Sequence, residues 1–293
     1  MQSRPLWLTL APALFLLLWA LGYSVAKIGL LYTDPMTLLA LRFGCVVIIM
    51  GFLFAVLRPP LPKTRADFLH LAFVGFLIQA VYFGCCYYAF HEGIGAGTLA
   101  LLMSFQPILV ALIAPLWTSE TVSRKSWIGL GLGLAGALLV IGSRTDIEPP
   151  TLLGLAFAAV ALCGISGGSI WEKRFGLSHH PVTANLIGYG AGFIGILPAL
   201  AIQDGFHIEW TGTFIAALAY LVIGNSVIAV GLLLAMIRAG DVSRVSALFF
   251  LVPPLAALAA WVSLGEVMPP LAWGGLALAS MGVYLATRTG RDV

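Results

Sequence analysis

Charged residues are scarce in this chain of 293 residues. They make up 9% of the sequence, whereas 60% of the residues are hydrophobic. Soluble domains carry roughly 25% charged residues, so this composition is typical of a membrane protein and argues against two soluble domains. The formal net charge of +3 is too small to indicate nucleic-acid binding. We therefore expect the lipid bilayer, and no nucleic acid, as a partner.

Motifs for metal binding and catalysis are also missing. The four cysteines, Cys45, Cys85, Cys86 and Cys163, lie inside apolar stretches without CxxC or metal-like spacing, which favours small buried residues. HExxH is absent, and no Ser or Cys has a recognisable base partner, which argues against an intramembrane enzyme. No Walker loop is present, so ATP does not drive the protein directly. The sequence predicts no metal, no cofactor and no catalytic site.

What the chain does contain is long apolar stretches, each close to the 20 or so residues that a membrane-spanning helix needs. The predicted fold is all-α and integral to the membrane, with ten spans. They are residues 6–31, 36–57, 67–90, 94–117, 126–143, 150–171, 181–203, 211–237, 242–263 and 268–288. The polar breaks between them are too short to hold a soluble domain.

Lysine and arginine fall mainly on one side of these spans. The side of the N-terminus carries Arg4, Arg58, Lys63, Arg65, Arg124, Lys125, Lys173, Arg174, Arg238, Arg244, Arg288 and Arg291. The other side carries only Lys27 and Arg144, and Arg42 lies within the second span. Because positive loops favour the cytoplasm, both termini are predicted to be cytoplasmic.

The sequence repeats itself at an offset of 146 residues. Matched pairs include Lys27/Lys173, Pro35/Pro181, Thr37/Thr183, Gly44/Gly190, Pro107/Pro253, Glu120/Glu266, Trp127/Trp273 and Gly136/Gly282. We place the first repeat at residues 1–146 and the second at 147–293. Each holds five spans, an odd number, so the second repeat must be inverted. Inverted repeats are common in secondary transporters, where alternating access exposes a site near the bilayer midplane.

The same residues resemble a known family. DPMTLLALRF (34–43), the stretch from Pro107 to Gly136, and PPLAALAAWVSLGE (253–266) are similar to the drug/metabolite transporter superfamily of EamA type. The chain looks most like bacterial exporters of aromatic and other neutral amino acids. The resemblance implies a multi-pass protein of the bacterial inner membrane, which exports such an amino acid. The alternative is a permease for another small metabolite or drug. Since one chain holds both repeats, a monomer is expected.

Polar residues inside the spans are candidates for the substrate site, because a polar group at the bilayer centre is costly. Gln79 and Asn225 are repeat equivalents near the middle of the third and eighth spans, and either bind a zwitterion or hold helices together. Gln79, Tyr82 and Cys86 have the spacing of one helical face. Tyr82 is favoured as a site residue, and Tyr88 is a candidate unless it belongs to an aromatic belt.

Glycines in the sixth span, CGISGGSIWEK (163–173), predict either a broken helix at the substrate or close helix packing. Ser166 and Trp171 are the candidate lining residues there, and Ser24 is the candidate in the equivalent part of the first span. Pro107 and Pro253 are predicted to kink the fourth and ninth spans and to act as hinges.

Two further features shape the expected mechanism. Arg42 could snorkel, pair with Glu92 or attract a carboxylate, and a structural role is favoured. No Asp or Glu is predicted near the middle of any span, so the hypothesis is facilitated diffusion or uniport rather than carboxylate-based proton antiport. A phosphorylated substrate would need several cations in the cavity and is disfavoured.

Overall fold

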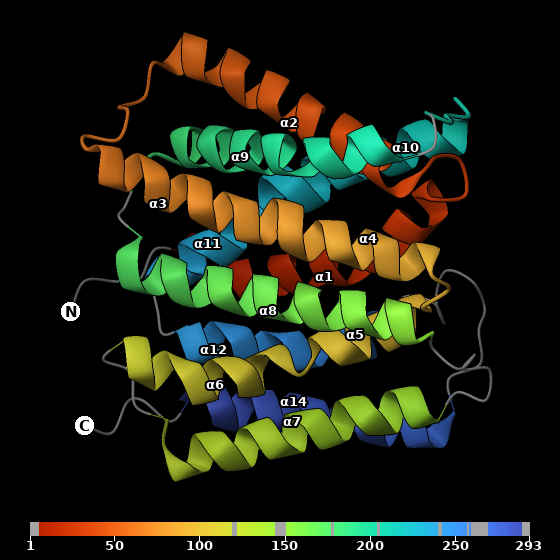
Figure 1. The fold of residues 1–293 in the computed structure, drawn as a ribbon. Coiled ribbons are helices and arrows are strands. Elements are labelled where there is room, and N and C mark those ends of the chain that lie inside the picture. Colours follow the sequence, from red (N-terminus) through yellow and green to blue (C-terminus); the bar gives the residue numbers. More distant parts are fainter. Residues whose placement is uncertain are drawn as a thin grey trace.

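The computed structural model describes residues 6–118, 122–143, 151–176, 179–203, 206–239, 242–256, 258 and 269–288, and within these it is an all-helical bundle (Figure 1). The described residues are helical at all ten predicted spans. Within this part of the chain, seven helical segments are long and apolar enough to cross a membrane. The predicted all-α membrane fold is confirmed. Glu120, Arg144 and Glu266 lie outside the described residues.

The first repeat contains seven helical elements before its last span. They are α1 (Leu6–Gly29), α2 (Pro35–Leu57), α3 (Arg65–Gly75), η1 (Phe76–Phe83), α4 (Gly84–His91), α5 (Ala96–Met103) and α6 (Gln106–Trp117). The last span is α7 (Arg124–Gly142). The third span is one continuous rod of α3, η1 and α4, and the fourth is divided into α5 and α6.

The second repeat follows the same plan. Its elements are α8 (Leu152–Phe175), α9 (Pro181–Ile202), α10 (Gly212–Tyr220), η2 (Leu221–Ala229), α11 (Val230–Ala239), α12 (Val242–Ala247), η3 (Leu248–Leu251) and α14 (Pro270–Arg288). Here α10, η2 and α11 form the equivalent of the third span. The 3₁₀ segment η3 follows α12 in the equivalent of the fourth.

Local sequence signals explain where these helices begin. Pro35 and Pro181 occupy the first turns of α2 and α9, where the missing N–H of proline costs nothing. Thr64 forms a capping box with Asp67 at the start of α3. Thr151 and Thr211 accept hydrogen bonds from backbone N–H groups at the starts of α8 and α10. The prolines remove N–H groups that the first helical turn leaves unpaired, and the threonine side chains accept hydrogen bonds from such groups.

Irregular helix recurs at equivalent places in the two repeats. η1 and η2 are π-helical and cover equivalent positions at the 146-residue offset. In the fourth span the helix breaks at Ser104 and Phe105, and in the ninth it tightens at η3. π-helical segments occur often at functional sites. Both pairs therefore mark the middle of the bundle as the region to examine.

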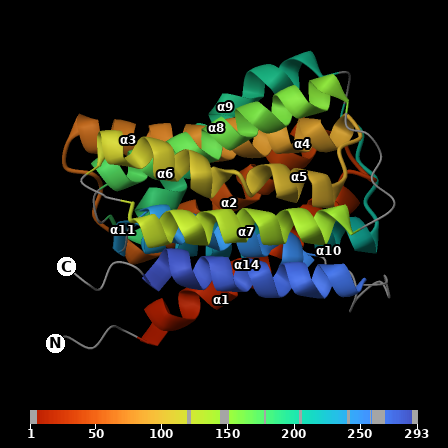
Figure 2. The same ribbon diagram turned by 90° about the horizontal axis from the view of Figure 1, so that it is seen from below.

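The contact between α7 and α14 demonstrates the inversion. A Cβ atom on Gly129 would lie 2.6 Å from the Gly282 oxygen, and one on Gly136 would lie 2.6 Å from the Gly275 oxygen. Gly129 is the repeat equivalent of Gly275, and Gly136 of Gly282, so each helix meets its own equivalent in the antiparallel sense. Figures 1 and 2 show the two helices side by side along their lengths. The two five-helix repeats are therefore inverted, and small residues allow their close packing.

Large apolar side chains cover the outside of the bundle. Ile48, Phe52, Leu116, Ile194 and Ile202 are among those that are two-thirds or more exposed. In water such a surface would be strongly unfavourable, whereas hydrocarbon accommodates it. Cys163 is exposed on this outer surface and only Cys86 is fully buried, which corrects the expectation that all four cysteines are buried.

Helix α8 decides between the two alternatives for its glycines and ends later than the predicted span. It runs without a break from Leu152 to Phe175, so its glycines serve close packing: a Cβ on Gly164 would lie 3.0 Å from the Leu77 oxygen of η1. The helix also extends beyond the predicted span, which brings Glu172 inside it. Glu172 is 1% exposed and forms an ion pair with Arg238 of α11. A buried acid is therefore present, although the sequence places it in a polar break.

The α7–α14 contact generates a stability prediction. Gly136→Ala should destabilise the protein by about 1–3 kcal/mol, because the added methyl group would overlap the backbone of Gly275 and Ala279. Gly131→Ala is the control on the same helix, because a Cβ there meets nothing within 4 Å. The measurement is thermal unfolding of purified protein in detergent. Equal melting temperatures for the two variants would contradict this packing.

Candidate functional site

Arg42 of α2 is the most unusual side chain in the bundle. It is completely buried, with 0% exposure. Its Nε donates to Ser226 Oγ at 2.6 Å, its Nη1 to Tyr87 Oη at 3.0 Å, and its Nη2 to Asn225 Oδ1 at 2.6 Å. All three partners are neutral. No acidic side chain pairs with Arg42 within the described part of the chain, so the alternative of a pair with Glu92 is not seen.

The energetics of this arrangement favour an anionic partner. Burying an ion costs several kcal/mol even after the protein relaxes, unless a counter-charge is nearby. The Phe83 ring, whose centroid lies 4.2 Å from Arg42 Cζ, offsets part of that cost through a cation–π contact. A guanidinium has five N–H donors, so three hydrogen bonds leave capacity for more. A carboxylate is well matched to what remains, because it can accept two parallel bonds.

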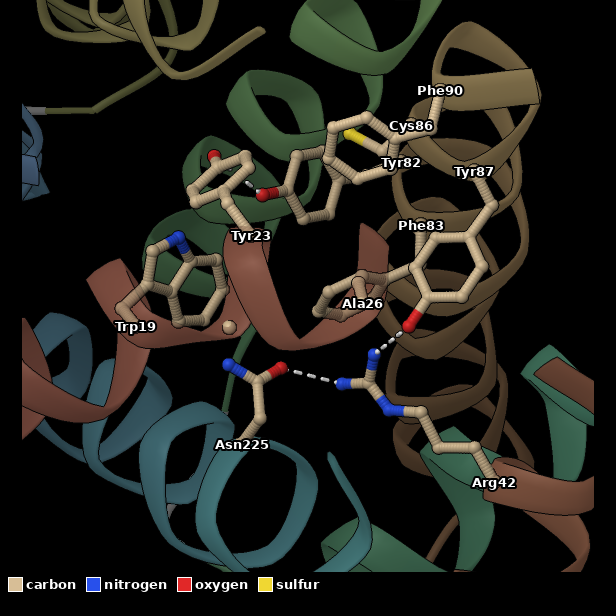
Figure 3. A pocket seen from close by; sticks show the side chains of 11 residues that line it. Trp19, Tyr23, Ala26, Arg42, Tyr82, Phe83, Cys86, Tyr87, Phe90 and Asn225 are labelled. Atoms are coloured by element: carbon tan, nitrogen blue, oxygen red, sulfur yellow. Dashed lines mark hydrogen bonds between the residues drawn. The ribbon is translucent and has the colours of Figure 1, made fainter. Parts of the chain in front are cut away.

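A cavity of about 20 Å³ lies against Arg42 and is walled mainly by aromatic rings (Figure 3). Its lining comprises Trp19, Gly22, Tyr23, Ala26, Arg42, Tyr82, Phe83, Cys86, Tyr87, Phe90 and Asn225. We call it the Arg42 cavity. The rings of Trp19 and Tyr82 are nearly parallel, 6.1 Å apart, and the hydroxyl groups of Tyr23 and Tyr82 are 3.0 Å apart. The cavity therefore combines one cation with a flat apolar wall.

Close packing between repeats brings the polar groups to Arg42. A Cβ on Gly22 of α1 would lie 3.2 Å from Asn225 Cγ, so glycine is needed for η2 to approach this closely. Asn225 Nδ2 also faces the Leu18 oxygen at 3.4 Å. Tyr189 of α9 donates to the Ser226 oxygen at 2.9 Å. The partners of Arg42 are thus fixed by groups from α1 and α9.

A second cavity, also of about 20 Å³, lies between α3, η1, α8, α9 and α11. Its lining is Leu71, Val74, Gly75, Ile78, Gln79, Glu172, Ala184, Asn185, Gly188, Tyr189, Leu234 and Arg238. We call it the Glu172 cavity, after its buried acid. Three of its positions are repeat equivalents of the Arg42 cavity: Gln79 matches Asn225, Glu172 matches Ala26, and Gly188 matches Arg42. The two cavities therefore occupy equivalent places in the inverted repeats.

The structure divides the expected third-span face between these cavities. Tyr82 and Cys86 line the Arg42 cavity together with Asn225, whereas Gln79 lines the Glu172 cavity. Gln79 belongs to η1, and the wider π-helical turn shifts side-chain directions away from the α-helical spacing. This corrects the expectation of one shared face.

Four other candidate residues line neither cavity. Ser24 is half-buried. Tyr88 is half-buried too, and its ring stacks on Phe157 at 5.2 Å. Ser166 is buried without a hydrogen-bond partner for its Oγ within the described residues. Trp171 donates to His70 Nδ1 at 3.2 Å.

Both candidate hinge prolines lie at the helix irregularities of their spans. Pro107 is buried in the first turn of α6, just after the break at Ser104 and Phe105. Pro253 is buried two residues after the end of η3 at Leu251, in the first turn of the helix that follows. Each proline therefore stands at the start of a half-helix rather than in the middle of a kinked one.

Sequence reasoning assigned Arg42 a structural role and missed Trp19, Tyr23 and Tyr87 as neighbours of a cavity. The sequence did indicate that Arg42 is unusual, because it is a cation inside a span and its repeat equivalent, Gly188, is a glycine. The Trp19–Tyr23 spacing also puts both rings on one helical face, although spacing alone cannot say what that face meets.

Comparisons with known proteins agree with this architecture. The EamA-like transporter family matches the chain twice, over residues 6–142 and 152–288. A probable amino-acid metabolite efflux pump of Salmonella typhimurium is 27% identical over 93% of this chain and 92% of its own. A probable terminal-alkyne amino-acid exporter of Streptantibioticus cattleyicolor is 28% identical over 66% of this chain and 64% of its own. One crystal structure superposes with a TM-score of 0.74 at 22% identity, covering 96% of both chains, which supports the fold.

Proposed function

Because this chain belongs to the EamA-like transporter family, we propose that it exports neutral, preferably aromatic, amino acids. Like the relatives named above, it is a multi-pass transporter and not an enzyme. The observation that carries the choice of substrate is the buried, acid-free Arg42 beside a wall of aromatic rings. The names of the two amino-acid exporters among its relatives support the same class.

In this proposal the substrate carboxylate binds Arg42. A carboxylate supplies the counter-charge that the buried guanidinium lacks, and it can bond to more than one N–H group. Entry of a cationic amino acid would instead place a second positive charge beside Arg42. The site should therefore reject lysine-like and arginine-like substrates as well as amines that lack a carboxylate.

The rest of the amino acid has complementary surroundings. An aromatic side chain fits against the nearly parallel rings of Trp19 and Tyr82, since offset stacking adds to the gain from burial. The α-ammonium group, which needs electron-rich neighbours, has the hydroxyl oxygens of Tyr23 and Tyr82 and the ring faces nearby. The cavity of about 20 Å³ has room for about one water molecule, so the amino acid binds when the walls separate in a more open conformation of the transport cycle.

The second candidate function is a permease for a different small carboxylate, because Arg42 alone does not require an ammonium group. Phosphorylated metabolites suit the site less well. Arg42 is the only cation that lines its cavity within the described residues, whereas a doubly charged phosphate favours several.

The transport cycle proposed is alternating access by exchange of conformations between the inverted repeats, operating as a uniport. The Arg42 cavity has no acidic lining residue among those described, so substrate binding there need not release a proton. The distribution of Lys and Arg in the loops supports cytoplasmic termini. Since one chain supplies both repeats and the whole cavity lining, a monomer suffices.

The proposal predicts that Arg42→Gln lowers counterflow of labelled L-phenylalanine in proteoliposomes by about 10-fold or more, because a lost charge-assisted bond costs about 1.5–3 kcal/mol. L-phenylalaninamide, which lacks the carboxylate, should compete poorly in the wild-type protein. Arg65→Gln is the control, since Arg65 is exposed at the start of α3.

Two results would contradict the carboxylate assignment. One is normal phenylalanine counterflow by Arg42→Gln protein that is inserted at wild-type levels. The other is equal competition by the amide and the free amino acid.

The break in the fourth span predicts an effect on turnover. Pro107→Ala restores a backbone N–H that can bond the Met103 carbonyl and extend α5 into α6. We expect the maximal counterflow rate to change several-fold, with a smaller change in phenylalanine binding affinity. Pro115→Ala, an exposed proline near the end of α6, is the control. An unchanged maximal rate for Pro107→Ala would rule out this hinge.

A further inference from the structure

The Glu172 cavity contains polar groups that the Arg42 site does not use. Glu172 is 1% exposed and Gln79 is 3% exposed. Gln79 Oε1 and Arg238 Nη2 are buried and have no hydrogen-bond partner within the described residues. Leaving a buried donor or acceptor unpaired costs about 1–3 kcal/mol, and more for a charged group. Both residues line the Glu172 cavity, so a ligand that enters when this cavity opens can pair with both.

The chemistry of the unpaired atoms specifies a kind of ligand. Arg238 Nη2 is a donor with a positive charge, which suits a carboxylate. Gln79 Oε1 is an acceptor, which suits an ammonium group, and the Glu172 carboxylate adds negative charge on the same cavity wall. Because Glu172 and Arg238 form an ion pair, their charges cancel. A molecule that carries one charge of each sign and no net charge is the best match.

The internal repeat relates the Glu172 cavity to the Arg42 cavity. Gln79 and Asn225, Glu172 and Ala26, and Gly188 and Arg42 are equivalent positions, one of each pair in each cavity. The Arg42 cavity thus has a cation where the Glu172 cavity has glycine, and alanine where the other has an acid. Tyr189, whose hydroxyl bonds to the Ser226 oxygen, connects the Glu172 cavity to the residue that holds Arg42. The hydrogen bonds of Tyr189 and Arg42 to Ser226 therefore link the two cavities.

We infer that the Glu172 cavity is a second binding site for the head group of an α-amino acid, in series with the Arg42 site. The inference rests on the proposed function for the identity of the substrate. The carboxylate binds Arg238, and the ammonium group binds Gln79 and Glu172. The apolar lining, Leu71, Val74, Ile78 and Leu234, receives the side chain but offers no stacked rings. This site therefore accepts neutral amino acids broadly, and aromatic preference arises at the Arg42 cavity.

The test is the number of amino-acid molecules bound per chain, measured by equilibrium dialysis of radiolabelled L-phenylalanine with purified protein in lipid nanodiscs. Wild-type protein should bind two. The double variant Glu172→Gln/Arg238→Gln, which removes both charges together and leaves no lone buried ion, should bind one. Arg42→Gln should also bind one, while Arg65→Gln should still bind two.

The outcomes separate this inference from the proposed function. One molecule bound by wild-type protein, lost in Arg42→Gln and retained in Glu172→Gln/Arg238→Gln, would overturn the second site and leave the first intact. No binding to wild-type protein would overturn both. If the double variant aggregates in gel filtration, Gln79→Leu replaces it, because this change leaves the ion pair in place. Two molecules bound by folded Gln79→Leu with wild-type affinities would also overturn the second site.

Discussion

A buried guanidinium group, which no acid pairs with among the described residues, is the constraint around which the centre of this bundle is organised. Arg42 bonds to Tyr87 of the third span and to Asn225 and Ser226 of the eighth, so it joins the two repeats. Its neighbours are neutral and hold its geometry without cancelling its charge. Such a group is costly unless something negative arrives. In the proposed function, the substrate supplies this negative group and completes the site.

The inverted repeats share one fold, and the residues that differ between them determine the chemistry of the two cavities. Glycine contacts between α7 and α14, π-helical segments in the third and eighth spans, and buried prolines at equivalent positions all follow the symmetry. The charged residues do not follow it. The repeat equivalent of Arg42 is Gly188, and the repeat equivalent of Glu172 is Ala26. A symmetric frame allows the halves to exchange conformations, while unmatched side chains give the two cavities different charges and different polar groups.

Hydropathy and the 146-residue repeat predicted the ten spans and their inversion. Both features are local in the sequence: a span is a long apolar stretch, and a duplicated Pro, Gly or Trp recurs at a fixed offset. Tyr82 and Asn225 were predicted and lie together at the Arg42 cavity. Gln79 was separated from Tyr82 because η1 is π-helical, which local spacing did not reveal. Arg42 was interpreted as structural because its partners are distant in sequence. Glu172 was missed because α8 extends past the apolar stretch and Arg238 pairs with it.

The central claim is that Arg42 receives the carboxylate of an aromatic amino acid. The most direct measurement is an experimental structure of the protein in lipid nanodiscs with bound 4-bromo-L-phenylalanine. The account predicts the carboxylate within hydrogen-bond distance of the Arg42 Nη atoms and the bromophenyl ring against Trp19 and Tyr82. A ligand bound in the bundle with its carboxylate away from Arg42 would contradict it.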